Sequence, residues 1–282
     1  MKTKMQTAVA YGQSKEVGIY ALASVVNALA ADGVESPAVQ VRIIIPAYAF
    51  KSRMHTMEKI IKKMCDERKI ILQDMKSERS VVITQSMVVV TGSGCVKQDV
   101  KEEDSLAGQD VVLTKFIGME GMLRILGEKG EELKSRFSLS FLKQMEDYKN
   151  DIFALEEIAC ARIYGVNQIY QMGEGGVFAA LWNLAKETGC GLEIDLKAIP
   201  VLQETIEVCE FFRLNPYQLT STGALLIVTG DGEGLVEKLS QMEIPAAVIG
   251  KLTDNNDKIL KNGEEIRYID RPAPDELLKI FE

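Results

Sequence analysis

Apolar residues recur at helical spacing in the first part of the chain and predict two helices, over residues 14–32 and 52–67. Ser52 is the expected N-cap of the second helix. Between them, the β-branched run over residues 39–45, closed by Pro46, predicts a strand. The apolar stripes of the two helices consist of Val17, Ala21, Val25 and Leu29, and of Met54, Met57, Ile61 and Met64.

Two further strands are expected directly one after the other, over residues 70–72 and 81–93. Consecutive strands exclude a doubly wound sheet in this half of the chain. A polar and charged stretch over residues 97–104 then interrupts the pattern and predicts a solvated linker. We therefore place an N-terminal domain at residues 1–98 and a C-terminal domain at residues 105–282.

The second half alternates between strands and helices. A strand at residues 110–114 is followed by helical stretches through residue 163, broken around Ser138 and Asn150. The alternation then continues over residues 177–188, 192–196, 203–212, 224–229, 233–241 and 245–249, with a short hairpin and a last helix at 274–281. This order predicts an α+β fold with layered helices and sheets in both halves.

Composition narrows the function without identifying it. Hydrophobic residues make up 46% and charged residues 26% of the 282 residues, as in ordinary globular proteins. The net charge of −8 and the aromatic content of 6% argue against nucleic acid or an anionic membrane as a partner. No apolar run is long enough to cross a bilayer, and no signal core follows the basic start, so we expect a cytoplasmic protein.

Cysteine and histidine usage argues against a zinc site. The five cysteines are widely spread, with no Cys-x-x-Cys pair, and His55 is the only histidine. A Cys/His zinc site or a histidine-based catalytic triad would need more of these residues at closer spacing. Reduced and mostly buried thiols are the expected state.

A glycine-rich turn is the first candidate binding site. It reads Gly173-Glu174-Gly175-Gly176 and stands immediately before a predicted helix. Glycines let the backbone approach a ligand closely, and the exposed N–H groups at a helix start favour a phosphate. Glu174 opposes a bare phosphate unless a metal or a base lies between them. The alternative is a tight turn that packs the helix closely on a sheet.

Motifs from both halves, in this order, resemble the aminoimidazole ribonucleotide (AIR) synthase superfamily. That superfamily includes AIR synthase, the hydrogenase maturation factor HypE, selenophosphate synthetase and thiamine-monophosphate kinase. The resemblance covers about residues 7–282. The segments that carry it are residues 14–33, 110–121, the pair Gly175-Gly176, Ile199-Pro200, Ser221-Thr222-Gly223, and residues 246–252 and 271–277.

The resemblance implies a two-domain fold, a dimer and a cofactor. Members typically dimerise through the sheet of the N-terminal domain, to which residues 39–45 and 81–91 would contribute here. The implied cofactors are ATP and Mg²⁺. Asp74 and Lys76 fit the hydrogenase-factor version of a further motif, with Asp74 as the metal ligand. Alternatively, residues 74–79 form a charged hairpin turn.

Several positions depart from the pattern of the superfamily. Relatives carry an aspartate where this chain has Ala28, next to a retained Asn27, and another where it has Gln171. Where relatives carry a threonine in the same motif, this chain has Gly173. Because Mg²⁺ favours carboxylate oxygens and neutralises phosphate charge, these changes argue against tight Mg-ATP binding.

The two ends of the chain also differ from relatives. Relatives carry a glycine-rich arm and an acidic strand before the segment that matches residue 7, and we expect the nucleotide contacts of that arm to be missing here. HypE ends in a cysteine that accepts a carbamoyl group, whereas this sequence ends in Phe281-Glu282. The first cysteine is Cys65, which argues against selenophosphate synthetase activity.

Two functions remain open. The first is a non-enzymatic, or residually nucleotide- or phosphate-binding, homodimer that has lost most of the Mg-ATP site. The alternative is an ATP-dependent phosphoryl-transfer enzyme, such as a hydrogenase-maturation-related protein or a small-molecule kinase or synthase. The residues expected to contact a small phosphorylated ligand are Asn27, Asp74, Lys76, Glu174, Gly175, Gly176, Ser221, Thr222 and Gly223.

Overall fold

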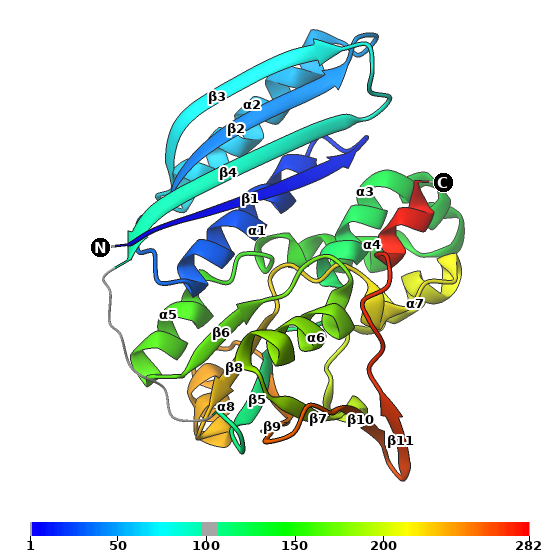
Figure 1. Ribbon diagram of the computed structural model, residues 1–282. Coiled ribbons are helices and arrows are strands. Elements are labelled where there is room, and N and C mark those ends of the chain that lie inside the picture. Colours follow the sequence, from blue (N-terminus) through cyan, green and yellow to red (C-terminus); the bar gives the residue numbers. More distant parts are fainter. Residues whose placement is uncertain (1, 97–105, 282) are drawn as a thin grey trace. The chain divides into compact units, whose positions relative to one another are not determined.

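The computed structural model describes residues 2–96 and 106–281, which form two compact units (Figure 1). The first unit holds the described residues up to 96 together with residues 124–137, and the second holds the remaining ones. Residues 124–137 thus group with the first unit, whereas the sequence placed them in the C-terminal domain. The expected linker, residues 97–104, lies outside the described residues, so the domain boundaries stay a prediction.

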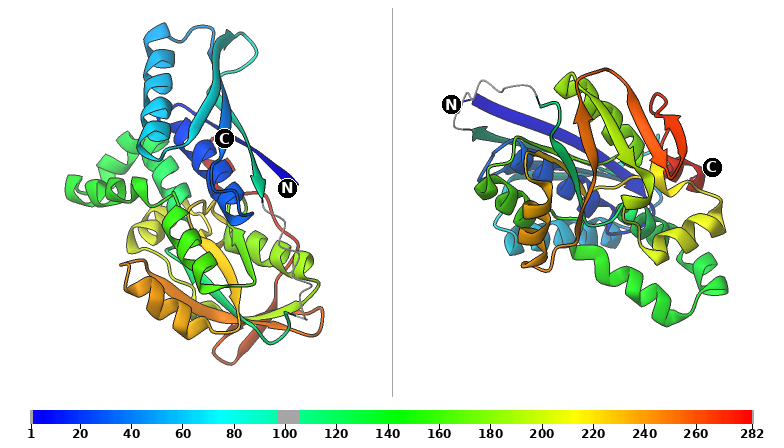
Figure 2. Two further views of the ribbon diagram at one scale, coloured as in Figure 1. Left: turned by 90° about the vertical axis from the view of Figure 1, so that its left-hand side faces the viewer. Right: turned by 90° about the horizontal axis from the view of Figure 1, so that it is seen from below.

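The first unit is built on a four-stranded sheet with two helices on one face (Figure 2). The strand order is β1-β4-β2-β3, with β2 and β3 parallel and the other pairs antiparallel. A crossover helix between β2 and β3 makes the parallel pairing feasible. The elements are β1 (Lys2–Gly12), α1 (Val17–Ala31), β2 (Ala38–Pro46), α2 (Lys51–Glu67), β3 (Ile71–Ser80) and β4 (Ser86–Val96).

Close packing of α1 on the sheet depends on a glycine. A Cβ added at Gly92 would lie 2.5 Å from Val25 Cγ1 and 2.8 Å from Leu29 Cδ1. The same face of β2 presents Val39 and Val41, which are fully buried, whereas Gln40 between them is exposed. Successive side chains of a strand point to opposite faces of the sheet. Because α1 and α2 both pack on one face, the face that carries Gln40 is not covered by them.

Three sequence expectations about this unit are wrong. The strand expected at 70–72 continues to Ser80, so residues 74–79 form part of β3 and not a hairpin turn. Alternate polar side chains in that run reach solvent, which made a strand resemble a charged turn. The turn lies at residues 81–85, where a strand was expected. The second helix begins at Lys51 with Phe50 in the N-cap position, so Ser52 is not its cap.

The second unit is a seven-stranded sheet covered on both faces. Its order is β11-β10-β7-β9-β5-β8-β6, and only β10 and β7 pair in parallel. The strands are β5 (Asp110–Thr114), β6 (Gln168–Gln171), β7 (Gly191–Asp195), β8 (Leu225–Thr229), β9 (Ala246–Thr253), β10 (Lys258–Asn262) and β11 (Glu265–Tyr268). The α-helices are α4 (Leu139–Asp147), α5 (Leu155–Tyr164), α6 (Gly176–Thr188), α7 (Gln203–Phe212) and α8 (Gly232–Ser240). A further helix, α3 (Met119–Arg136), has its first turn in this unit and its remainder in the first unit.

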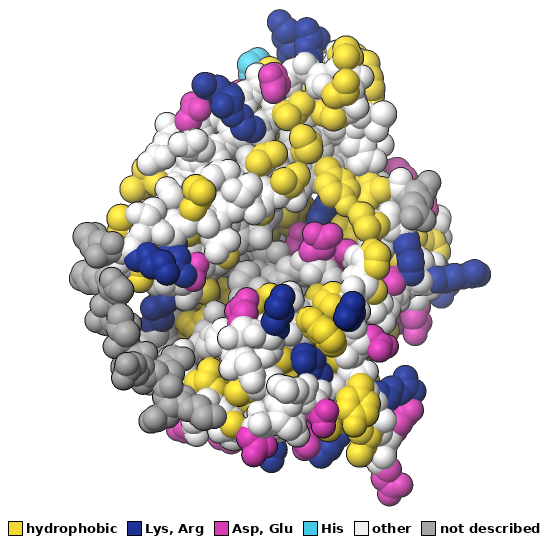
Figure 3. Space-filling model, in the orientation of Figure 1, with side chains coloured by type: hydrophobic (Ala, Val, Ile, Leu, Met, Phe, Trp, Pro, Cys, Tyr) yellow, Lys and Arg dark blue, Asp and Glu magenta, His cyan; other side chains and the backbone are white. Residues whose placement is uncertain are grey.

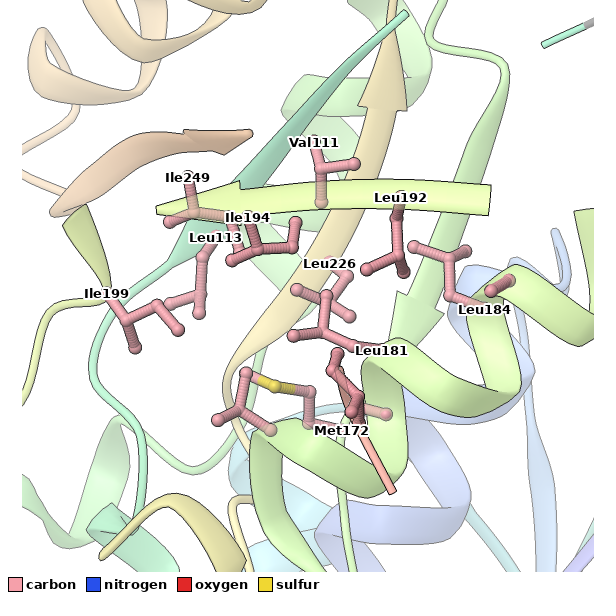
Figure 4. Packing of buried hydrophobic residues seen from close by; sticks show 14 of the residues in the cluster. Val111, Leu113, Met172, Leu181, Leu184, Leu192, Ile194, Ile199, Leu226 and Ile249 are labelled. Carbon is pink, nitrogen blue, oxygen red and sulfur yellow. The ribbon is translucent and has the colours of Figure 1, made fainter. Parts of the chain in front are cut away.

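The core of this unit lies between α6 and the sheet (Figure 4). Val111 and Leu113 of β5 join Leu181 and Leu184 of α6, and all four are buried. Val112 is also fully buried although it points to the other face, where α8 packs against β5 and β9. Burial of each such side chain stabilises the fold by about 1.5–3 kcal/mol.

Short 3₁₀ helices connect the larger elements. They are η1 (Tyr148–Asn150), η2 (Leu196–Ala198), η3 (Pro216–Gln218) and η4 (Glu276–Ile280). The helix expected at 274–281 is therefore a shorter 3₁₀ helix, and β6 was not anticipated at all. No helix in the described part of the chain is long and apolar enough to span a membrane.

A buried ion pair fixes the loop that leads from β5 into α3. Lys115 adopts a left-handed conformation with φ of 56°, which turns its side chain inward. Its Nζ lies 2.6 Å from Glu157 Oε1 and donates to the carbonyl oxygens of Asp151 at 2.6 Å and Phe153 at 2.9 Å. Burial raises the pKa of Glu157, and the Lys115 ammonium partly opposes that rise. The loop that precedes Glu120 is thus held by side-chain and backbone contacts together.

Candidate functional site

The three candidate residues of the first unit do not converge. Asn27 is fully buried in α1, which covers one face of the sheet. Asp74 pairs in register with the exposed Gln40 and therefore lies on the opposite face. Lys76 follows on that same face, with its Nζ 3.9 Å from Asp74 Oδ2. Asn27 is thus separated from Asp74 and Lys76 by the sheet itself.

The glycine-rich turn of the second unit connects β6 to α6. Gly175 and Gly176 both have positive φ, of 79° and 64°. A Cβ at Gly176 would lie 2.6 Å from the carbonyl oxygen of Tyr217 and within 3.0 Å of the Leu219 backbone. The Gly176 N–H donates to the carbonyl oxygen of Gly173 at 3.1 Å. This turn accordingly packs against the segment before Thr220, at a distance that only glycine permits.

A carboxylate near the C-terminus accepts one N–H group of this turn and two from other segments. Asp275 Oδ2 accepts from the Gly175 N–H at 2.6 Å. Its Oδ1 accepts from the Thr220 N–H at 3.3 Å and from the Leu277 N–H at 2.8 Å. Asp275 is only 5% exposed. One side chain therefore joins the start of α6, the segment before β8 and the start of η4.

A second buried carboxylate holds the neighbouring loop. Glu120 Oε2 accepts from the Thr220 hydroxyl at 2.7 Å and from the Thr222 N–H at 3.0 Å. Between these two residues, the Ser221 hydroxyl accepts from the Gly118 N–H and donates to the Leu219 carbonyl, both at 2.8 Å. The Ser221 N–H donates to the Gly173 carbonyl oxygen at 3.2 Å. The loop is thereby tied to the start of α3 and to the glycine-rich turn.

The two carboxylates influence each other electrostatically. Burial raises the pKa of Asp275 to about 6, and the negative charge of Glu120 adds to the rise. The N–H groups of Gly175, Leu277 and Thr220 act in the opposite direction, because they stabilise the ionised form. Desolvation outweighs these hydrogen bonds, so the proton on Asp275 is held more tightly in the folded protein than in an exposed carboxyl.

The backbone donors of the candidate anion site are therefore engaged within the chain. The N–H groups of Gly175, Thr220 and Thr222 donate to carboxylates, and those of Gly176 and Ser221 donate to a carbonyl oxygen. A phosphate would have to displace a buried carboxylate to use the first three, so this arrangement does not fit a phosphate at those groups. The remaining candidates of this unit differ in exposure, since Glu174 is exposed and Gly223 is buried.

Sequence reasoning did not assign the two residues that organise this site. Glu120 and Asp275 lie inside segments that resemble the superfamily, yet neither was selected as functional. Asp275 stands at the N-cap of η4 and accepts from the Leu277 N–H, and an aspartate before a short apolar helix is a recognisable capping signal. Asp275 is separated from its partner Gly175 by 100 residues, and Glu120 from its partner Thr222 by 102 residues. No local sequence pattern reveals such contacts.

The chain belongs to the AIR synthase related proteins. A model of the C-terminal domain of this family matches residues 107–261, which is more than half of the chain. MJ0676 of Methanocaldococcus jannaschii, a protein named for hydrogenase expression or formation, is 22% identical over 281 residues, spanning 94% of this chain and 79% of MJ0676. The chain thus resembles a hydrogenase-related relative over most of its length.

Solved structures of hydrogenase maturation proteins share the fold. The crystal structure of E. coli HypE aligns with a TM-score of 0.79 at 19% identity, covering 99% of this chain and 89% of that one. A structure of HypE in complex with ATP aligns with a TM-score of 0.73 at 15% identity, covering 99% and 88%. The predicted α+β, AIR-synthase-like fold is confirmed.

Two glycines at the ends of α6, Gly176 at its start and Gly189 directly after it, allow the packing role of the turn to be measured. We expect Gly176→Ala to lower the free energy of unfolding by at least about 3 kcal/mol, because a Cβ would meet three backbone atoms as well as the left-handed strain. Gly189→Ala is the matched control. Gly189 has a φ of 67°, and a Cβ added there would have no described atom within 4 Å beyond those of its chain neighbours. This variant should therefore lower the free energy of unfolding by only about 1–2 kcal/mol. If urea unfolding showed the same loss of unfolding free energy for both variants, the packing role of Gly176 would be contradicted.

Asp275 should make stability depend on pH. Its folded-state pKa of about 6 exceeds the usual 3.8, so its contribution is fully present below about pH 4 and is lost as the pH rises through 6. When the pH is lowered from 7 to 4, the free energy of unfolding of the natural protein should rise by on the order of 2–3 kcal/mol relative to that of Asp275→Asn. Urea unfolding at four pH values measures this difference, with the exposed Asp254→Asn as the control. Parallel profiles for the natural protein and Asp275→Asn would refute the assignment.

Proposed function

We propose that this chain is a HypE-like, hydrogenase-maturation-related member of its family that has lost most of the Mg-ATP site and acts without catalysing phosphoryl transfer. One observation carries the proposal: the carboxylates of Asp275 and Glu120 occupy the backbone donors at Gly175, Thr220 and Thr222. Internal carboxylates satisfy these donors as a phosphate would, so the loops gain nothing there from a nucleotide.

The chemistry of two further positions supports the loss. Ala28 and Gln171 stand where relatives carry aspartates, and neither side chain can supply the carboxylate oxygens that Mg²⁺ prefers. The Gln171 amide donates to the carbonyl oxygen of the next residue, Met172. Phosphoryl transfer depends on metal ions that bridge the phosphates and neutralise developing charge. A residual contact with nucleotide or phosphate is compatible with this proposal, whereas tight Mg-dependent binding is not.

The uncovered face of the first unit's sheet supports a homodimer. Met5 and Val9 on β1 are 70% and 51% exposed, and Val9 lies opposite Val89 of β4 in register. Figure 3 shows apolar side chains spread over these strands. Apolar side chains that alternate along adjacent strands form a flat, self-complementary surface of the kind that a symmetric dimer buries.

An ATP-using enzyme is the second candidate. A structure of HypE in complex with ATP shares the fold of this chain with a TM-score of 0.73. In this alternative, Asn27, Asp74, Lys76 and Glu174 would be the remaining polar groups of the site, with Asp74 as a ligand of Mg²⁺. The two candidates differ in one measurable property, which is Mg-dependent nucleotide affinity.

Calorimetric titration with a non-hydrolysable ATP analogue distinguishes the two candidates. The proposal predicts a Kd no tighter than about 1 mM, unchanged by Mg²⁺. Micromolar binding that requires Mg²⁺ and is weakened by Asp74→Ala, but not by Asp254→Ala on an exposed turn, would support the enzyme instead.

Sedimentation analysis tests the dimer. The natural protein should sediment as a dimer and Val9→Glu as a monomer, because an unpaired charge would be buried where β1 contributes to the interface. Val81→Glu is the matched control, since Val81 is 87% exposed in the turn between β3 and β4. A monomeric natural protein, or a dimer that tolerates Val9→Glu, would refute this interface.

A further inference from the structure

The second unit contains a cavity of about 260 Å³ beside the start of α6. The apolar part of its lining, called the floor below, includes Phe178, Leu196, Leu260 and Ile269. The Phe178 ring is fixed by stacking on Tyr217, with ring centroids 5.3 Å apart and an interplanar angle of 8°. Sites for drug-sized ligands occupy about 300–1,000 Å³, so this cavity suits a more compact molecule.

An exposed strap forms one wall of the cavity. It comprises residues 270–274, which run from β11 toward η4 (Figure 1). The strap is anchored at both ends: the Ile269 N–H donates to the Lys258 carbonyl oxygen at 2.8 Å, and Asp275 accepts three backbone N–H groups. Pro272 and Pro274 restrict the backbone between these anchors. The backbone of the strap is therefore restricted where it passes the cavity.

The strap carries two oppositely charged side chains that form no ion pair within the described part of the chain. Asp270 and Arg271 both line the cavity, and neither forms an ion pair or side-chain hydrogen bond with another described residue. The two other charges of the lining satisfy each other, because Arg267 donates to Glu265 Oε1 from two nitrogens, at 2.9 and 2.6 Å. The charges left for a ligand are thus one carboxylate and one guanidinium.

We propose that this cavity binds a small zwitterion with an apolar body, of the class of apolar α-amino acids. The apolar side chain of the ligand lies on the floor near Phe178 and Leu260. The ligand carboxylate pairs with Arg271, whose planar guanidinium suits a carboxylate, and its ammonium pairs with Asp270. Because the backbone of the strap is already restricted, binding requires ordering of the Asp270 and Arg271 side chains but little further ordering of the main chain. This inference goes beyond the proposed function and does not depend on it.

Gly175 connects the cavity with the buried carboxylates but offers it no donor. Gly175 lines the cavity, yet its N–H is bonded to Asp275. A phosphate would find no free N–H at this point, and only one of the two arginines in the lining lacks a partner. The lining therefore favours a ligand that carries both charges over a dianion.

Three probes with the same apolar body test the proposal by calorimetry on the full chain. L-Phenylalanine carries both charges, 3-phenylpropanoate only the carboxylate, and phenethylamine only the ammonium. We expect L-phenylalanine to bind with a Kd on the order of 0.1–1 mM, as its size allows. The two singly charged probes should bind at least about tenfold more weakly, since each loses one charged contact.

Variants at the strap identify the two charged contacts. Arg271→Gln should weaken the binding of L-phenylalanine and 3-phenylpropanoate by about tenfold and leave the binding of phenethylamine unchanged. Asp270→Asn should weaken the binding of L-phenylalanine and phenethylamine and leave the binding of 3-phenylpropanoate unchanged. The controls Arg136→Gln and Asp254→Asn change exposed charges that do not line the cavity. The proposal would be overturned if L-phenylalanine did not bind, if 3-phenylpropanoate bound as tightly as L-phenylalanine, or if neither strap variant changed the affinity for L-phenylalanine. The ATP-analogue titration has a separate readout, so either proposal can fail alone.

Discussion

The second unit depends on burying the carboxylates of Glu120 and Asp275 close to each other. An ionised carboxylate that leaves water without hydrogen bonds loses several kcal/mol, so each one needs donors supplied by the fold. Backbone N–H groups from the turn before α6, from the loop before β8 and from η4 meet that need. These loops consequently cannot rearrange independently, because each movement would expose or orphan a charge.

The same geometry explains why a phosphate site was a reasonable expectation. Converging backbone N–H groups next to a helix start attract any anion, and a carboxylate of the chain competes for them at a far higher effective concentration than a dissolved ligand. A glycine pattern therefore indicates that an anion will be held, whereas the identity of the anion depends on side chains elsewhere. Here Gly176 also serves backbone packing against Tyr217 and Leu219.

Much of the fold follows from local patterns, and the exceptions have physical reasons. The helix expected at 14–32 and the strand at 110–114 were found, because α1 and β5 have strongly apolar buried faces. The polar run in β3 was mistaken for a turn, since one face of that strand meets solvent. Of the candidate site, the glycine turn was selected from its glycines and its place before a helix, and residues 221–223 from their resemblance to relatives. Asp275 and Glu120 were not assigned, because their roles arise only when distant segments meet.

The span of these contacts has a consequence for biosynthesis. Gly175 and Thr220 emerge from the ribosome long before Asp275, which follows Gly175 by 100 positions. Until then the turn before α6 has no internal acceptor for its N–H group, and native packing of this unit must wait for the tail. Contacts of such separation slow folding, because a long loop has to close before any of them forms. Nascent chains that stall shortly before residue 275 would therefore present an incomplete unit to chaperones and proteases.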